Sequence, residues 1–202
     1  MISLTGCTNY LPFQGDEDDP QGDEDTPGSE LGETDSKWTQ RFDQSIESDR
    51  ILLSPESVPN GFEFFEDNLL TLDEAVGEEQ SEMQERGLLL QHSRTFLGEE
   101  GTRQEEGHLA SELEVYESVE QAAEQKESHT DTFLSAYEGE IKETILNHPI
   151  DTTVITASQS DNHKQYIING QGSNLLLRVL IMGDIEQSTL ENLYSRMVIS
   201  IN

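Results

Sequence analysis

The histidines and the single cysteine are the side chains best suited to metal or acid–base chemistry, but their spacing suits neither. No two histidines lie at a metal-ligand spacing, and Cys7 is far from all of them. Gly170-Gln171-Gly172 lacks the following helix and third glycine of a dinucleotide-binding loop, and the sequence holds no nucleophile elbow. Carboxylates become catalytic only in a rigid, desolvated site. We therefore expect no enzyme, no cofactor and no metal-ligating residue. The histidines are His92, His108, His129, His148 and His163.

A dense acidic tract at residues 16–25 is the next candidate. It lacks the alternating ligands and the terminal glutamate of a calcium-binding EF-hand loop. Such a tract attracts basic proteins and repels nucleic-acid phosphates, so we expect no direct contact with nucleic acid. An acidic chaperone for basic proteins is one alternative function.

Trp38 and Phe42 form a short aromatic motif that suits a protein partner. The two rings are four residues apart and share one face of a helix. The segment Trp38-Thr39-Gln40-Arg41-Phe42 resembles the Trp-x-x-x-Phe pentapeptide of peroxisomal import receptors. That resemblance covers five residues and implies that the two rings fill adjacent pockets of a helical docking protein.

Residues 61–76 alternate acids with bulky apolar side chains. On helical spacing one face holds five apolar residues, and the acids lie elsewhere. The pattern predicts an amphipathic helix that folds into a groove on a partner, as acidic activation segments do. A transcriptional co-regulator is therefore the main alternative function. The residues of this face are Phe62, Phe65, Leu69, Leu72 and Val76.

Several hydroxyl groups are candidate phosphorylation sites, because an acid follows at the third position or a proline follows directly. Phosphate would add roughly −1.5 to −2 charges at each. The candidates are Thr26, Ser54, Thr71, Ser111, Ser128, Ser158 and Ser188.

Residues 109–147 have the apolar spacing of a helix. Leu109, Leu113 and Tyr116 lie near a heptad seam, and apolar residues recur every four positions from Phe133 to Ile145. This spacing predicts an amphipathic helical segment at about 109–146, of coiled-coil character, that ends before Pro149.

The C-terminal quarter has the pattern of folded structure. Residues 152–156, 165–168 and 174–182 read as strands, 185–197 as a helix and 198–201 as a last short strand. A strand as apolar as 174–182 must be covered on both faces. We expect a small α+β element of antiparallel strands plus one helix at about 150–202, within a region 148–202 that docks or oligomerises. Its apolar contact residues are Leu175, Leu177, Val179, Ile181, Leu190 and Leu193.

The rest of the chain is poor in apolar residues. Hydrophobic residues make up 33% of the sequence, and 42 acidic residues against 11 basic ones give a formal charge of −31. Globular chains are typically about 45–50% apolar. The composition therefore predicts a mostly intrinsically disordered protein, with residues 1–108 as an acidic disordered region that carries short motifs.

The acidity is uneven along the chain. Residues 1–150 hold 37 acids against 8 bases, whereas residues 151–202 hold 5 against 3. Acidity adapted to high salt should also cover the folded part, so this gradient argues against a halophilic protein.

A single cysteine favours a reducing compartment, the nucleus or cytoplasm. No apolar run is long enough to cross a membrane as a helix. Leu4-Thr5-Gly6-Cys7 has the form of a bacterial lipoprotein cleavage box, but only six residues precede Cys7 and none is basic. We interpret the match as chance.

These features predict a non-enzymatic adaptor or regulatory subunit. Its partners are proteins with basic or hydrophobic grooves, and residues 109–202 are the region through which two copies would associate. The two alternatives given above, a transcriptional co-regulator and an acidic chaperone, remain open.

Overall fold

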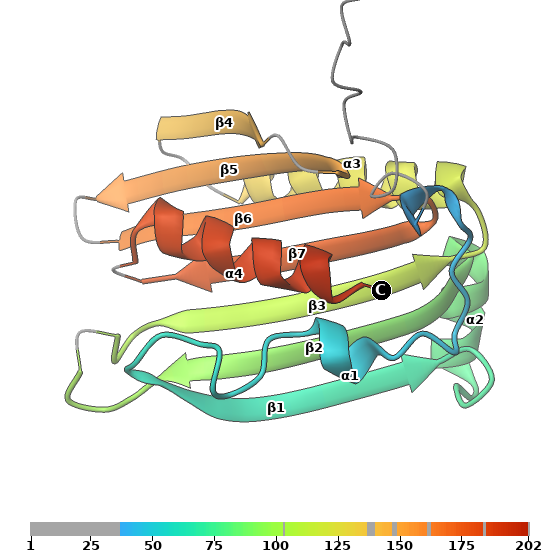
Figure 1. Ribbon diagram of the computed structural model, residues 1–202, viewed down its shortest axis with the longest axis horizontal. Helices are drawn as coiled ribbons and strands as arrows, with labels where there is room; N and C mark the ends of the chain where they lie inside the picture. The colour runs from blue at the N-terminus through green and yellow to red at the C-terminus, as the bar shows by residue number, and fades with distance from the viewer. Residues whose placement is uncertain are drawn as a thin grey trace, which may run out of the picture. The chain divides into compact units, whose positions relative to one another are not determined.

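The computed structural model describes residues 37–102, 104–136, 140–146, 149–160, 163–183 and 185–201. These residues form one seven-stranded antiparallel sheet with helices on both faces (Figure 1). The strand order is β1-β2-β3-β7-β6-β5-β4, so the last strand in the chain lies at the centre of the sheet.

Each half of the sheet is built from strands that are adjacent in sequence. One half holds β1 (Phe62–Thr71), β2 (Leu88–Gly98) and β3 (His108–Tyr116). The other holds β4 (Glu140–Leu146), β5 (Asp151–Ser160) and β6 (His163–Gly172). Strand β7 (Leu175–Met182) joins the halves by pairing with β3 and β6.

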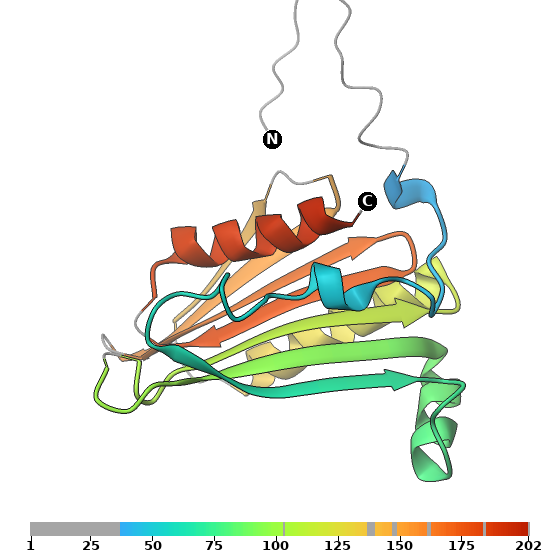
Figure 2. The same ribbon diagram turned by 60° about the horizontal axis from the view of Figure 1, so that its bottom comes forward.

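The helices divide between two faces of the sheet. Helices α1 (Ser48–Ile51) and α4 (Gln187–Ser200) lie on the front face, toward the viewer in Figure 1, and α2 (Glu78–Arg86) and α3 (Val119–Ser135) lie on the back face (Figures 1 and 2). Ser118 caps α3 by accepting a hydrogen bond from the Gln121 amide. Gly87 ends α2 in the left-handed conformation that glycine adopts without strain.

Residues 37–61, which we call the strap, cross the front face (Figure 2). The strap contains a 3₁₀ helix, η1 (Lys37–Thr39), and α1. Its side chains Trp38, Ile51 and Leu53 are buried in the main core. Asn174, at the start of β7, holds the strap by its backbone: the Asn174 side chain accepts from the Phe42 amide at 2.8 Å and donates to the Phe42 carbonyl at 2.9 Å.

This chain itself covers both faces of β7. The front-facing side chains of β7 pack against α4 and the strap, as the main core. On the back face, Leu176 packs with Met83 of α2 and Ala122 of α3, and Leu180 packs against the cluster that contains Phe133. The sequence indicated that the face of β7 away from α4 must also be covered, and α3 covers it.

The expectation of a mostly disordered chain is wrong for residues 37–201. Strand β2 shows the reason, because its side chains alternate between buried and half-exposed positions over most of its length. A sheet that is solvated at every second position needs only half of its residues to be apolar. The low apolar content therefore reflects an acidic surface on a folded domain.

One predicted helix is a strand, and the other is helical only in its middle part. Residues 109–146 contain β3, α3 and β4 instead of one helix, and residues 62–71 form β1 instead of an amphipathic helix. Apolar residues four apart share a face in a strand as well as in a helix, because a strand repeats every two residues. That ambiguity misled the helix assignment.

The expected α+β element at 150–202 is not a separate unit. Its strands correspond to β5, β6 and β7, and its helix corresponds to α4, which continues to Ser200 through most of the residues expected as a final strand. Because β7 pairs with β3, the sheet runs across the boundaries expected at residues 108 and 147.

Candidate functional site

Five polar side chains meet on the front face, and we call them the strap cluster: Ser48, Asp49, Asp67, His92 and Arg94. Asp67 of β1 stands opposite Arg94 of β2 in the register. His92 lies two residues before Arg94, so alternation points all three side chains to the same face. Ser48 and Asp49 come from the first turn of α1.

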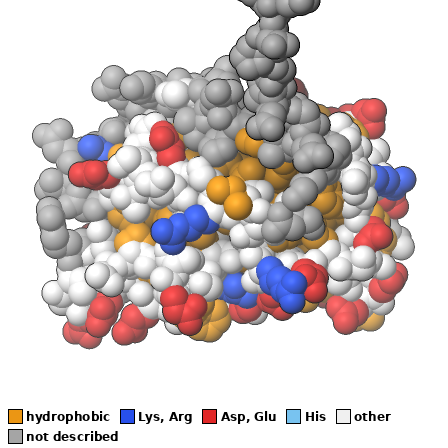
Figure 3. All heavy atoms as spheres, in the orientation of Figure 1, with side chains coloured by type: hydrophobic (Ala, Val, Ile, Leu, Met, Phe, Trp, Pro, Cys, Tyr) orange, Lys and Arg blue, Asp and Glu red, His pale blue; other side chains and the backbone are white. Residues whose placement is uncertain are grey.

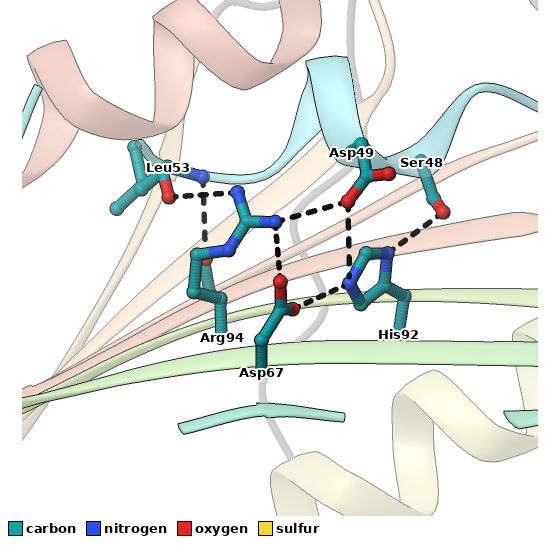
Figure 4. Close-up of polar contacts among 7 residues, drawn as sticks. Ser48, Asp49, Leu53, Asp67, His92 and Arg94 are labelled. Carbon is teal, nitrogen blue, oxygen red and sulfur yellow. Dashed lines mark hydrogen bonds and ion pairs between the residues drawn. The ribbon is translucent and has the colours of Figure 1, made fainter. Parts of the chain in front are cut away.

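His92 lies at one side of the strap cluster, with the carboxylates of Asp49 and Asp67 between it and Arg94 (Figure 4). Its Nδ1 is 2.7 Å from Ser48 Oγ, and its Nε2 is 2.6 Å from Asp67 Oδ1. His92 is 1% exposed. It therefore links the strap on one side to the edge strand β1 on the other.

Arg94 provides the second link. Its Nη2 donates to Asp67 Oδ2 at 2.8 Å and to Asp49 Oδ1 at 3.1 Å, and its Nη1 donates to the Leu53 carbonyl at 3.3 Å. Ser111 of β3 accepts from the Leu53 amide at 3.3 Å. Burial raises the pKa of Asp67, but hydrogen bonds from Arg94 and His92 outweigh it and hold that pKa below the ordinary 3.8.

Ser48, His92 and Asp67 have the hydrogen-bond order of a hydrolase triad, but their burial argues against that chemistry. The nucleophile of such an enzyme must reach its substrate. Ser48 is 5% exposed, and the member of the trio that reaches solvent is the carboxylate, Asp67. The trio holds the strap in place and does not present a nucleophile.

Asp49, Asp67 and His92 also place three possible metal-ligand atoms within 4.8 Å of one another. Arg94 argues against a divalent ion there, because its guanidinium already bonds both carboxylates. A metal ion would have to displace a buried cation that also binds the strap backbone. We therefore interpret Arg94 as the cation of the strap cluster.

A second polar cluster lies on the back face, between the sheet and its two helices. Tyr116 donates to Glu114 at 2.8 Å, and Arg86 of α2 donates to both of them at 3.2 Å. Arg178 of β7 bonds Glu112 of β3. Burial raises the pKa of Tyr116, and the Glu114 charge adds to that effect.

His129 of α3 faces the same cluster, 3.8 Å from Glu114. Burial, with help from Arg178, lowers the pKa of His129 to about 4, so the ring is neutral at neutral pH. The cavity between these groups has a water-accessible volume of about 10 Å³. That space suits about one water molecule and no metabolite.

Strand β1 exposes apolar side chains at the edge of the sheet. Phe64, Phe65 and Leu69 are 50%, 61% and 48% exposed. A β-bulge shifts the register between Phe64 and Glu66, and the Phe64 ring meets the buried Phe96 ring edge-on. Figure 3 shows hydrophobic side chains between acidic ones along the lower margin of the front face, where Figure 1 places β1.

The partner-binding residues expected from the sequence divide by exposure. Phe65 and Leu69 lie exposed on β1, and Phe42 and Leu72 are half-buried. The others build the core of the domain and cannot meet a partner while it is folded. They are Trp38, Phe62, Leu175, Leu177, Val179, Ile181, Leu190 and Leu193.

The candidate phosphorylation sites also divide by exposure. Ser128 and Ser188 are exposed, and Ser54 and Thr71 are half-buried. Ser111 is fully buried in β3, where a kinase cannot reach it. Thr26 and the side chain of Ser158 lie outside the described residues.

The strap cluster was not expected from the sequence, although the sequence carries one signal of it. Between Leu90 and Phe96, His92 and Arg94 occupy the positions that alternation assigns to the core. Polar residues at core positions of an alternating strand indicate a buried hydrogen-bond network. Their partners in the strap had no such signal, because α1 is a single short turn.

In the part of the chain that the structure describes, no helix combines the length and the apolar character needed to cross a membrane.

Comparisons with known proteins identify the fold and not a family. No protein-family model matches the sequence, and no curated protein matches it. Among solved structures, the chain is similar to the extracellular domain of PknH from Mycobacterium tuberculosis, with a TM-score of 0.55 and 11% sequence identity. The match covers 81% of this chain and 98% of that domain. The chain therefore shares the fold of that extracellular domain.

Proposed function

We propose that this chain is a non-enzymatic protein-binding protein of the adaptor or regulatory type, and that the exposed surface of β1 is its binding site. The observation that carries the proposal is the set of large apolar side chains, Phe64, Phe65 and Leu69, exposed together on an edge strand. Adjacent exposed apolar side chains on a folded domain often mark interaction surfaces.

The polar clusters support a binding role over catalysis. In the strap cluster each ionisable side chain is bonded to a neighbour, and its serine is buried. On the back face, Arg86 and Arg178 are both paired with glutamates. Groups that satisfy one another rigidify a domain and leave little to act on a substrate.

The alternative functions draw less support. A transcriptional co-regulator was expected to use residues 61–76 as a helix, but residues 62–71 are a strand of the sheet. An acidic chaperone would use residues 16–25, which lie outside the described residues.

A comparative capture experiment tests the proposal. Tagged full-length protein and the variant Phe65→Ser/Leu69→Ser are each incubated with lysate of the source cells. We expect a defined protein bound by the unchanged chain and lost with the variant. Ile199→Ser, which alters an exposed apolar residue on α4, is the matched control and should retain it. If the variant and the control retain the same proteins, β1 is not the binding site.

Two observations favour a setting other than the nucleus or cytoplasm. The similar solved structure is an extracellular domain, and Leu4-Thr5-Gly6-Cys7 has the form of a lipoprotein cleavage box. We propose, as a second candidate, that the domain works outside the cell; the cleavage-box match, interpreted above as chance, would then be a true lipid-attachment site at Cys7.

Fractionation of the source cells separates the two settings. If the second candidate holds, the protein partitions with membranes and is cleaved by protease added to intact cells, and Cys7→Ser releases it from the membrane fraction. Protection from the protease in intact cells would support the nucleus or cytoplasm.

A further inference from the structure

We propose that β1 binds an extended segment of a partner protein as an additional strand, and that this segment alternates basic with apolar residues. The inference rests on the proposed protein-binding function and adds the mode of binding and the chemistry of the partner. Extended peptides commonly bind sheets by pairing with an exposed edge, where main-chain hydrogen bonds give affinity and alternate side chains give specificity.

The outer edge of β1 provides the backbone for this pairing. Strand β1 pairs with β2 on one side and ends the sheet on the other. Seven consecutive residues, 63–69, are exposed. In Figure 1 no other element of the described chain lies beyond this edge, and in Figure 2 only α2 lies below β1, at its C-terminal end.

The register divides the side chains of β1 by chemistry. On the front face, Phe64 packs against Phe96, and Leu69 follows beyond Asp67. On the back face, Glu63 and Glu66 stand opposite Leu97 and Thr95 of β2. An added strand would therefore meet mainly apolar groups on its front side and two carboxylates on its back side.

The carboxylates of β1 differ in their freedom to bind a partner. Asp67 is bonded to His92 and Arg94. Glu63 and Glu66 are exposed, and they lie on a domain of strong negative charge. Because side chains of a strand alternate between faces, a partner with Lys or Arg at every second position would place these charges beside Glu63 and Glu66. Its intervening apolar side chains would then lie beside Phe64 and Leu69.

A second copy of this chain is a poor occupant of the same edge. Antiparallel pairing of two β1 strands would bring Glu63, Glu66 and Asp67 of one copy close to the same acids of the other. Like charges directly opposite in a sheet are destabilising. The competing interpretation is that the bulge and the acids only protect the edge against aggregation.

Synthetic peptides of ten residues, the length of β1, test the inference. The first alternates Lys with Val, the second alternates Glu with Val, and the third is the Lys peptide with N-methyl groups on the amides that would face β1. Binding to the full chain is followed by NMR titration and by hydrogen exchange of the β1 amides. We expect the Lys peptide alone to bind and to protect the outer amides of β1.

Paired variants test the charge requirement. Glu63→Lys/Glu66→Lys should weaken binding of the Lys peptide by roughly tenfold, because it replaces attraction with repulsion. Glu120→Lys/Glu124→Lys makes the same change of charge on α3 and should leave the affinity unchanged. Equal loss in both pairs would show a nonspecific attraction to the acidic domain and would overturn the inference.

The remaining outcomes are also decisive. Equal binding of the methylated and unmethylated peptides overturns strand addition, as does absence of Lys-peptide binding or protection confined to other strands. If partner capture still requires Phe65 and Leu69, the protein-binding function stands and only the mode is wrong. If partner capture does not depend on those residues, the proposed function itself is wrong. Formation of dimers without peptide, seen by sedimentation, would favour the second copy and also overturn the inference.

Discussion

Asp67 Oδ1 lies 2.6 Å from His92 Nε2, and this contact joins a side chain of the exposed edge strand to a histidine that is almost fully buried. The other ring nitrogen of His92 contacts Ser48 of the strap. The proposed binding strand and the strap are therefore anchored to the same buried side chain. Loss of this anchor should loosen both elements together.

Arg94→Met tests the energetic role of the strap cluster. It removes a buried cation that binds two carboxylates and the Leu53 carbonyl. We expect the free energy of unfolding to fall by about 2 kcal/mol, below the range for fully buried pairs because both carboxylates reach solvent. Urea unfolding measures it. Arg50→Met breaks an exposed pair with Glu47 and should cost less than about 0.5 kcal/mol. Equal losses would contradict the interpretation of Arg94 as an anchor.

His129 should make stability depend on pH between about 6.5 and about 4. Its pKa is about 4 in the folded protein and 6.5 ordinarily, so the unfolded chain binds the proton first as pH falls. The folded state therefore loses stability through this window. Unfolding with urea across this pH range should show the decline in the unchanged protein and a smaller one in His129→Gln.

Asp67 should affect stability at a lower pH than His129 does, so it serves as the control for that experiment. Its pKa lies below 3.8 in the folded state, so its contribution is present above the ordinary pKa and is lost as pH falls through the folded value. Asp67→Asn should leave the slope above about pH 5 unchanged. If His129→Gln and Asp67→Asn alter the same range, the assignment of the two windows is wrong.

Ser48 should not react as a nucleophile, because its side chain is buried where the strap contacts the sheet. A fluorophosphonate probe incubated with the folded protein should leave Ser48 unlabelled, as mass spectrometry of the digested chain would show. Ser48→Ala should lower the free energy of unfolding by about 1 kcal/mol through loss of its contact with His92. Labelling that disappears in Ser48→Ala would revive the hydrolase hypothesis.

Gly172→Ala should displace the first part of the strap. A methyl group at Gly172 would collide with the Trp38 ring and with Ile150. Overpacking of this kind costs about 1–3 kcal/mol. Trp38 is the only tryptophan and is 9% exposed, so its fluorescence reports directly on the strap. We expect its emission to shift to longer wavelength in Gly172→Ala and to stay unchanged in Ser128→Ala. An unchanged spectrum in both would show that the strap tolerates the methyl group.

Salt should stabilise this domain. Ten of the 42 acidic residues and none of the 11 basic ones precede residue 37, so residues 37–202 carry a formal charge of −21. Self-repulsion of this size weakens a compact state, and salt screens it. We expect the melting temperature to rise with KCl, and to rise less in Glu78→Gln/Glu79→Gln/Glu82→Gln. A melting temperature that stays constant or falls as KCl is added would contradict the hypothesis that charge repulsion destabilises the domain. The uneven acidity was taken above as an argument against a halophilic protein. That argument fails, because most of the acidic residues belong to the folded domain.

Local patterns in the sequence determined the elements of the C-terminal quarter. The β-branched and apolar runs there are dense enough to indicate β5, β6 and β7, and the spacing of Leu190, Leu193 and Met197 indicates α4. The need to cover both faces of residues 174–182 also followed from the sequence, since a strand with apolar side chains on both faces cannot leave either face to water. The excess of acids was equally plain.

The tertiary structure alone decided how the rest of the chain folds and where its polar side chains meet. Leu109 and Leu113 have a spacing that suits a helix or a strand, and only pairing of β3 with β7 selects the strand. Asp67, His92 and Ser48 come from three segments with no shared motif, so their contact depends on the register of β1 with β2 and on the path of the strap. Local propensity reports on neighbours along the chain, whereas strand pairing and burial depend on residues far apart in sequence.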